Sequence, residues 1–293
     1  MRLLILGCGY TGARLGRSLR SRGVEVVVTN RTGVRPPELA DVPCYPFDGE
    51  RTPLDPAALE GVTHVLSSIP PDRQGEDAVV KSLLPRLERQ GLVWFGYLST
   101  TGVYGDRQGN WVDETTPVNP QNPRSRQRVA IEQAFLNADL PTHIFRLPGI
   151  YGPGAGRNAI SRILEGKVQL IDKPGHYFCR IHVDDIVQTL ERSLEFPTPH
   201  AIYNLSDDQP SESLPVLLEA YRLLGRPAPA AIPLDQADLS PMALSFWQES
   251  RRVRNDKIKQ VLGVRLRYPS YREGLAAILR DTPASVLQAG HGA

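Results

Sequence analysis

The feature that most constrains this chain is a cluster of three glycines near its start, in the segment Gly7-Cys8-Gly9-Tyr10-Thr11-Gly12. A short aliphatic run, Arg2–Leu6, precedes the cluster, and a helical pattern over residues 12–22 follows it. The next segment, residues 24–28, is again apolar and rich in valine. Strand, tight turn, helix and strand in this order make up the βαβ unit of a parallel sheet.

Glycines at this spacing between a strand and a helix are typical of a turn that binds a dinucleotide. Gly7 permits the tight turn, Gly9 lets the backbone approach a diphosphate, and Gly12 lets the helix pack closely on the strand. The N–H groups at the start of the helix, in Tyr10 and Thr11, would then face the phosphates. We therefore predict a bound nicotinamide dinucleotide; the alternative is a glycine-rich turn without a ligand.

The end of the second strand bears on the choice between NADP and NAD. A site selective for NAD usually has a carboxylate there, but this sequence reads Thr29-Asn30-Arg31. Asn30 removes the repulsion toward a 2′-phosphate, and Arg31, together with Arg35, would pair with it. NADP is thus favoured over NAD, and a solvated surface arginine remains the alternative.

Further contacts to the cofactor are predicted at Asp48, Ser67 and Pro148. Asp48 follows the third predicted strand, where it would accept a hydrogen bond from the adenine amino group. An aspartate that only shapes a turn would look the same in the sequence.

Strand and helix patterns alternate over the first half of the chain. Strands are predicted at residues 42–47, 62–67, 92–99 and 142–147, and helices at 76–90 and 125–138. This alternation predicts an α/β fold of Rossmann type, a doubly wound parallel sheet with helices on both faces.

The alternation loosens after Gly149, and this change suggests how the chain is divided. We predict a dinucleotide-binding domain over residues 1–206, in which a loop and helix at 152–178 contribute to a lid. A smaller C-terminal region for substrate binding is predicted over 207–280, with a short helix at 256–262, and residues 281–293 are expected to be a frayed tail.

Composition and charge exclude several classes of protein. The net charge of +2 and the mixed charges give no basic stripe for nucleic acid or for an anionic membrane. No apolar segment approaches the ~20 residues of a membrane-spanning helix. The three cysteines, Cys8, Cys44 and Cys179, are widely spaced and favour neither disulfides nor a metal site. We expect a cytoplasmic protein without a metal.

Four segments behind the glycine turn resemble the extended short-chain dehydrogenase/reductases, of the NAD-dependent epimerase/dehydratase type. They are Leu98-Ser99-Thr100-Thr101-Gly102-Val103-Tyr104-Gly105; Phe145-Arg146-Leu147-Pro148-Gly149-Ile150-Tyr151-Gly152-Pro153-Gly154; Arg180-Ile181-His182-Val183-Asp184-Asp185-Ile186; and Tyr268-Pro269-Ser270-Tyr271-Arg272-Glu273-Gly274-Leu275. Together with the glycine turn, these segments span most of the chain.

The resemblance implies a Ser or Thr that faces the nicotinamide, followed by a Tyr-x-x-x-Lys pair on the next helix. Thr100 matches the first position, but Arg124 and Arg128 stand where the tyrosine and lysine would be. In this respect the chain is similar to the atypical branch of the superfamily, whose members keep the cofactor motifs and lose the catalytic pair.

Arginine cannot replace the tyrosine chemically, because its guanidinium stays protonated and cannot cycle a proton. Arg128 would keep the electrostatic and ribose-binding role of the lysine, and Arg124 would bind an anionic group of a substrate. The alternative for both is a basic helix face that pairs with Glu132 at helical spacing.

Other residues are candidates with simpler alternatives. Tyr104 and Tyr151 would supply the missing proton or bind substrate, although such tyrosines more often only pack. His182 is expected to cap the helix that starts beside Asp184 rather than to act as a base. Arg251 would line a pocket for a phosphorylated or carboxylated substrate, or it lies on a solvated face.

Two hypotheses follow for the function. The first is an NADP-dependent oxidoreductase or epimerase with an altered proton donor, which acts on a small polar metabolite of neutral or anionic character. The second is a non-catalytic NADP-binding sensor or regulatory protein, as the missing Tyr-Lys pair would suggest. The resemblance also implies that homodimers are common.

Overall fold

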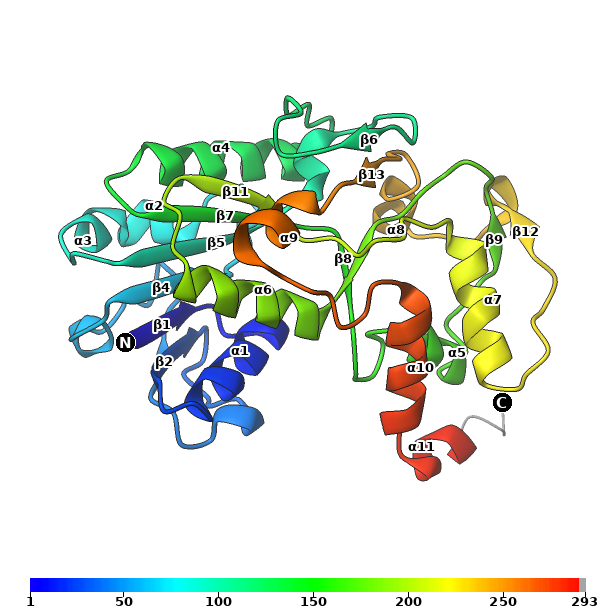
Figure 1. The fold of residues 1–293 in the computed structure, drawn as a ribbon, viewed down its shortest axis with the longest axis horizontal. Coiled ribbons are helices and arrows are strands. Elements are labelled where there is room, and N and C mark those ends of the chain that lie inside the picture. The colour runs from blue at the N-terminus through cyan, green and yellow to red at the C-terminus, as the bar shows by residue number, and fades with distance from the viewer. Residues whose placement is uncertain (290–293) are drawn as a thin grey trace.

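A seven-stranded parallel sheet forms the centre of the computed structural model, which describes residues 1–289 (Figure 1). Its strands are β1 (Arg2–Leu6), β2 (Glu25–Asn30), β3 (Cys44–Pro46), β4 (His64–Ser67), β5 (Trp94–Thr100), β7 (Thr142–Leu147) and β11 (Ala201–Asn204). They lie in the order β11-β7-β5-β4-β1-β2-β3. The strand order reverses between β1 and β4, and ligands of open α/β sheets bind at such a switch point.

Helices cover both faces of the sheet, as the alternating pattern predicted. The helices α1 (Tyr10–Arg20), α6 (Val183–Glu195) and α9 (Asp256–Leu262) share one hydrophobic core with one face of the sheet. The helices α2 (Ala78–Ser82), α3 (Leu84–Glu88) and α4 (Pro123–Asn137) share a second core with the other face. The strands are nearly continuous in apolar residues because they are buried on both sides.

The single helix predicted over residues 76–90 is two short helices in the structure. α2 ends at Ser82 and α3 begins at Leu84, with Pro85 in the first turn of α3. Proline has no N–H to donate and its ring clashes with the preceding turn, so a continuous helix cannot pass through it. The N-terminus of α2 is capped by Asp77, whose carboxylate accepts from the N–H groups of Val79 and Val80.

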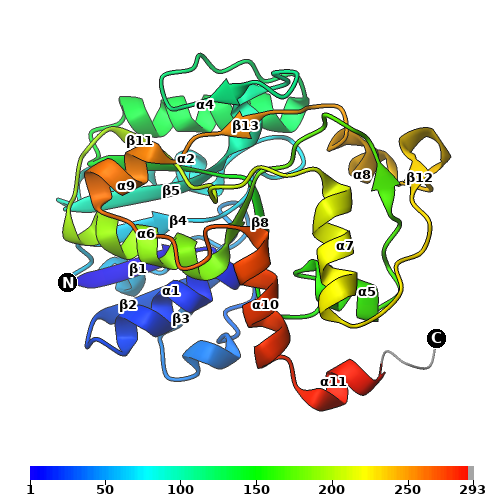
Figure 2. The same ribbon diagram turned by 45° about the vertical axis from the view of Figure 1, so that its right-hand side comes forward.

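Three helices form a smaller unit beyond the carboxyl ends of the strands (Figure 2). They are α5 (Ala159–Leu164), α7 (Ser213–Leu223) and α10 (Tyr271–Asp281), and they share a separate core around Ile160, Val216 and Leu275. α5 comes from the segment that was expected to contribute to a lid, and it packs with helices from the C-terminal part of the chain. α9, although it lies within residues 207–280, packs on the sheet instead.

Three pairs of very short strands lie outside the central sheet. β8 (Gly149–Tyr151) pairs with β10 (Arg180–His182), β9 (Ile171–Asp172) with β12 (Ile232–Pro233), and β6 (Trp111–Val112) with β13 (Arg252–Val253). The sequence analysis missed these pairs, because two or three residues show no periodicity. The short helix α8 (Pro241–Ser245) lies between β12 and β13 in the sequence.

Part of the C-terminal segment that was expected to fray is helical. Residues 284–289 form the helix α11 (Ala284–Ala289), and residues 290–293 lie outside the described residues. Among residues 1–289 we find no helix whose length and hydropathy would let it span a bilayer. The same residues contain no cluster of His, Cys, Asp and Glu side chains that is placed to hold a metal ion.

Candidate functional site

The glycine turn between β1 and α1 has the geometry that its sequence predicted. Gly7 has a φ of +78°, in the left-handed region that favours glycine. A Cβ atom on Gly12 would lie 2.9 Å from the Cγ2 atom of Ile5, so only glycine lets α1 lie this close to β1. Thr29 at the end of β2 fixes the turn, because its hydroxyl accepts from the N–H of Gly7 at 3.1 Å and its carbonyl from that of Cys8 at 2.6 Å.

The N-terminus of α1 is open. Gly9 is its N-cap residue, no side chain caps it, and its first turn carries no acidic residue. A Cβ atom on Gly9 would meet only the carbonyl oxygen of Gly7, at 4.0 Å. The first N–H groups of the helix therefore face free space, and with the positive end of the helix dipole they suit an anion.

A buried hydroxyl lies beside this turn. Ser67 ends β4 next to β1, is fully buried, and has an Oγ atom without a hydrogen-bond partner among the described residues. The adjacent Ser68 donates to the carbonyl of Gly7 at 2.6 Å and so secures the turn from the same side. An open helix end and an unpaired hydroxyl at the switch point fit a dinucleotide.

A cavity of about 780 Å³ opens at the carboxyl end of β5. Its walls come from β5, the first turns of α4, the α5 region and the segment around α8. Six cations line it against two carboxylates, Asp238 and Glu249; the cations are Arg124, Arg128, Arg162, Lys167, Arg180 and Arg251. Within residues 1–289, no ion pair is formed by any of four lining arginines, namely Arg124, Arg128, Arg162 and Arg180. The cavity therefore favours an anionic ligand.

Thr100 and Arg128 lie together where the cavity meets the sheet. Thr100 ends β5, and its hydroxyl accepts from the N–H of Gly102 at 3.1 Å. Arg128, on α4, donates to the hydroxyl of Tyr97 at 2.6 Å and to the carbonyl of Leu98 at 3.1 Å. These two bonds hold the guanidinium against β5 at the cavity wall.

Comparisons with known proteins identify the family. Residues 75–206 match the sequence profile of the NAD dependent epimerase/dehydratase family. The chain shares 45% sequence identity and a TM-score of 0.86 with a conserved protein of unknown function from Silicibacter pomeroyi DSS, over 96% of this chain and 98% of the other. The chain belongs to the NAD dependent epimerase/dehydratase family. No curated protein matches the sequence.

Two more distant structures share the fold. The UDP-glucuronic acid 4-epimerase from Bacillus cereus, solved with NAD, is 18% identical with a TM-score of 0.77, over 99% of this chain and 100% of the other. The UDP-glucose 4-epimerase from Thermus thermophilus, also solved with NAD, is 22% identical with a TM-score of 0.73, over 97% and 100%. Similarity at this level shows a common epimerase fold.

The two arginines that were predicted to stand in place of the Tyr-Lys pair are both at the cavity. Arg124 is exposed in the first turn of α4, with its guanidinium 5.4 Å from the ring centre of Phe246. Neither it nor Arg128 pairs with Glu132, which was the alternative expectation. Glu132 is buried, forms an ion pair with Arg146 and accepts a hydrogen bond from Ser99 instead.

The structure places Tyr104 outside the cavity. Its side chain is fully buried, and its hydroxyl donates to Asn204 at 2.8 Å and accepts from Arg146 at 3.0 Å. Burial also raises the pKa of Tyr104. This geometry is that of a packed structural tyrosine, the alternative given for it above.

Tyr151 and His182 also have structural contacts. Tyr151 is buried, donates to the carbonyl of Ser270 at 3.3 Å, and lines a smaller cavity of about 240 Å³ that shares Arg162 and Arg180 with the first. His182 is the N-cap of α6, where its ring accepts from the N–H of Asp184 at 3.2 Å. Burial lowers the pKa of His182 to about 4, which keeps the ring neutral and able to accept this bond.

The residues expected at the adenosine end lie around the ends of β2 and β3. Asn30 shapes the loop after β2: its amide oxygen accepts from the N–H groups of Thr32 and Gly33 at 3.0 and 2.7 Å. Arg31 is exposed, and no hydrogen bond or ion pair of its side chain occurs within residues 1–289. Arg35 donates instead to the carbonyl of Ala40, at 3.2 Å.

Asp48 shapes a turn. One of its carboxylate oxygens accepts from three backbone N–H groups, those of Glu50, Arg51 and Thr52. The bonds from Thr52 and Glu50 hold the pKa of Asp48 below its usual range. Because this oxygen is already used, a bond from adenine would fall to the other oxygen.

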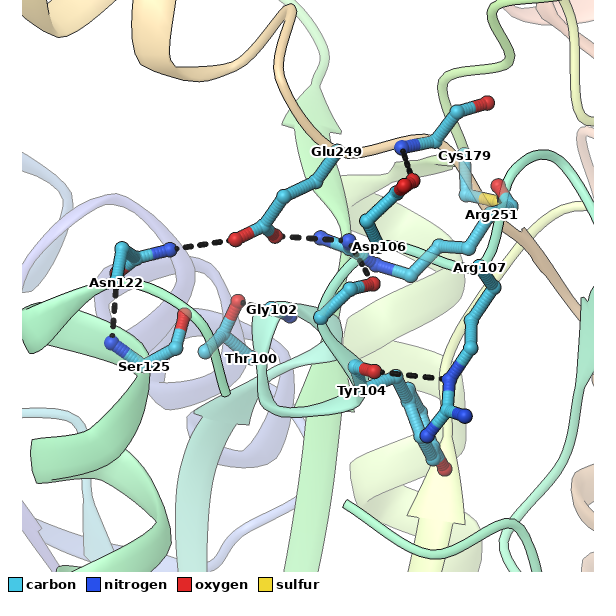
Figure 3. Close-up of polar contacts among 12 residues, drawn as sticks. Thr100, Gly102, Tyr104, Asp106, Arg107, Asn122, Ser125, Cys179, Glu249 and Arg251 are labelled. Carbon is cyan, nitrogen blue, oxygen red and sulfur yellow. Dashed lines mark hydrogen bonds and ion pairs between the residues drawn. The ribbon is translucent and has the colours of Figure 1, made fainter. Parts of the chain in front are cut away.

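An acidic residue that was not predicted from the sequence lies on the cavity wall. Glu249 accepts from the side chain of Asn122 at 2.9 Å and from Arg251 at 2.9 Å, and Arg251 also donates to the carbonyl of Gly105 at 2.7 Å (Figure 3). These bonds tie the C-terminal segment to the start of α4, where Asn122 is the N-cap. Asn122 before Pro123 is a recognisable helix start, but no local sequence pattern predicts that Glu249 is its hydrogen-bond partner.

Proposed function

We propose that this chain is an NADP-dependent oxidoreductase or epimerase that acts on a small anionic hydroxyl or carbonyl compound. The observation that carries the proposal is the cationic cavity whose lining includes Thr100 and Arg128. The sequence resemblance predicts that these two residues lie beside the nicotinamide. A nicotinamide at this place would accept a hydride from the substrate or donate one to it.

The cofactor proposal rests on the glycine turn and its surroundings. The open N-terminus of α1 and the free space at Gly9 are suited to a diphosphate. Two structures of the same fold were solved with NAD, which supports a nicotinamide dinucleotide. The choice of NADP rests on Arg31, an exposed cation without a partner among the described residues, and on the absence of a carboxylate at position 30.

The substrate proposal rests on charge. Arg124 and Arg162 reach the same cavity and form no ion pair among residues 1–289, so a carboxylate or phosphate group would make charge-assisted hydrogen bonds with them. The structural relatives include epimerases of UDP-sugars, which are anionic. We therefore propose an anionic sugar derivative or a hydroxy acid as the class of substrate.

The chain's own residues would divide the work at the reacting carbon. Thr100, at the end of β5, would hydrogen-bond the hydroxyl or carbonyl oxygen of the substrate. Arg128, which Tyr97 and Leu98 hold in place, would stabilise negative charge on that oxygen and bind the ribose. Arg124 would orient the anionic group. Since neither arginine cycles a proton, the proton would pass to another group or to water.

The test is a turnover assay with the purified protein. Sugar phosphates, hydroxy acids and UDP-glucuronic acid are incubated with NADP or NAD, and reduced nicotinamide and epimerised products are measured. We expect turnover of one or more anionic compounds with NADP preferred, and a loss of about tenfold or more in kcat/KM for Arg124→Ala. Binding of NADP without turnover of any compound would contradict the proposal and favour the non-catalytic sensor.

A further inference from the structure

Two arginines meet at the first residue of α1, outside the large cavity. The guanidinium carbon of Arg14 lies 4.0 Å from the centre of the Tyr10 ring, and that of Arg157 lies 4.6 Å from the same centre. Arg14 is on α1 itself, whereas Arg157 comes from the loop 152–158 between β8 and α5. Cations from two distant parts of the sequence are therefore brought to one aromatic ring.

The contacts of the loop fix this arrangement. The Tyr10 hydroxyl donates to the carbonyl of Pro153 at 2.8 Å, and Arg14 donates to the same carbonyl at 3.4 Å. A Cβ atom on Gly152 would lie 2.5 Å from the Tyr10 hydroxyl oxygen and 2.7 Å from a methyl group of Val183, so only glycine allows the loop to approach this closely. The loop is thus held against the side chains of Tyr10 and Arg14.

The charges of the two arginines are not balanced by a carboxylate. Within residues 1–289 neither Arg14 nor Arg157 forms an ion pair, and the nearby Asp184 contacts His182 instead, at 3.6 Å. The cation–π contacts with Tyr10 stabilise each guanidinium only modestly when exposed. Two like charges at one ring without a counter-ion indicate a place for an anionic ligand.

The position of Tyr10 indicates which anion this is. It is the first residue of α1, next to Gly9, and its own N–H belongs to the open helix terminus described above. We propose that Arg14 and Arg157 form an arginine clasp that binds the diphosphate of the dinucleotide beside the helix terminus. The inference rests on the proposed function, and it assigns to the loop 152–158 a part in cofactor binding.

The clasp makes a prediction about which ligands it affects. NADP, NAD and ADP-ribose all contain the diphosphate, whereas adenosine 2′-monophosphate lacks it. Loss of one charge-assisted bond to a phosphate corresponds to about a tenfold loss of affinity or more. Arg157→Ala and Arg14→Ala should therefore weaken binding of the first three ligands by similar factors and leave the fourth unchanged.

The experiment is isothermal titration calorimetry of the full chain with these four ligands. Arg17→Ala is the matched control, because it removes the same charge from an exposed position on the same helix. Tyr10→Phe removes the bond to Pro153 but keeps the ring, and should weaken the three diphosphate ligands by a smaller factor. Thermal melting of each variant without ligand verifies that it is folded.

The outcomes separate the clasp from the proposed function. Equal affinities of wild type, Arg14→Ala and Arg157→Ala for NADP, NAD and ADP-ribose would overturn the clasp, as would an equal effect of Arg17→Ala. A tenfold loss confined to the diphosphate ligands supports it. If the wild-type protein binds neither NADP nor NAD, the proposed function fails, and the clasp fails with it.

Discussion

The Arg128 guanidinium donates to the phenol oxygen of Tyr97 over 2.6 Å. Tyr97 is a fully buried residue of β5, and burial raises its pKa, so its hydroxyl stays protonated and accepts this bond as a neutral group. The second bond of Arg128, to the carbonyl of Leu98, goes to the same strand. A cation is therefore fixed at the end of β5, at the position where the sequence resemblance implies a lysine.

Restoring the family's pair tests this correspondence of positions. The double variant Arg124→Tyr/Arg128→Lys replaces two permanent cations with a group that can carry a proton and a cation that lowers its pKa. General acid catalysis typically contributes about 10²–10⁴-fold to a rate. We expect the variant to gain oxidoreductase activity with NADP and the compounds of the panel. An inert double variant beside an active parent would show that the positions do not correspond.

Arg31→Asp tests how the cofactor is chosen. A carboxylate at this position would repel a 2′-phosphate and accept from a ribose hydroxyl, so we expect the ratio of NADP to NAD affinity to fall by about tenfold or more. Calorimetry with both cofactors measures the ratio, and Arg51→Asp, a change at another exposed arginine, serves as the control. An unchanged ratio in Arg31→Asp would mean that the 2′-phosphate is not recognised there.

Glu132→Ala tests the buried ion pair below the site. Glu132 and Arg146 are 2% and 4% exposed and their charged atoms lie 2.7 Å apart, so the variant leaves Arg146 buried without a counter-ion. We expect a loss of about 3–5 kcal/mol in the free energy of unfolding by urea. The double variant Glu132→Leu/Arg146→Met should recover most of it. A loss below about 1 kcal/mol in the single variant, the size found for exposed pairs, would contradict this role.

His143 makes stability depend on pH. Burial lowers its pKa from 6.5 to about 4, and its ring accepts from the N–H of Thr198 at 2.9 Å in the neutral form. In the unfolded chain the imidazole has the higher pKa of 6.5 and takes up a proton when the pH falls below it. The contribution of His143 to the free energy of unfolding is therefore fully present above about pH 6.5 and is lost as the pH falls toward 4. Between pH 7 and 5, urea unfolding should show a loss about 2 kcal/mol larger in wild type than in His143→Gln. Equal losses would argue against a buried neutral ring.

Sequence reasoning worked where local pattern and backbone geometry decide the outcome. The strand Thr142–Leu147 and the helix Asp256–Leu262 have the predicted bounds. The strand is a short segment buried on both faces, and the buried residues Ile258 and Leu262 of the helix lie one helical turn apart. The turn at Gly7 could be predicted because a strand that leads directly into a helix needs a tight turn, which glycine permits. The capping role of His182 followed from the acidic residues behind it.

The rest depends on contacts between distant segments. Glu249 reaches Asn122 across 127 positions, and Arg157 reaches Tyr10 from another part of the chain, so no window of sequence contains either pair. Glu132 was considered as a partner for Arg128 because of helical spacing, but Arg146 of β7 takes its carboxylate. Helical spacing places Arg128 and Glu132 on one face of α4, but it does not show that Arg146 of the neighbouring strand competes for the Glu132 carboxylate.

The most direct test of the account is a titration of NADP into wild type and Gly9→Asp. Position 9 is an N-cap with free space around it, so an aspartate there should stabilise α1 by about 0.3–1 kcal/mol while it occupies and repels the site of the diphosphate. We predict that wild type binds NADP, and that Gly9→Asp melts at the same or a higher temperature and loses binding by at least about a hundredfold. Absence of NADP and NAD binding in wild type, or unchanged binding in Gly9→Asp, would contradict the account.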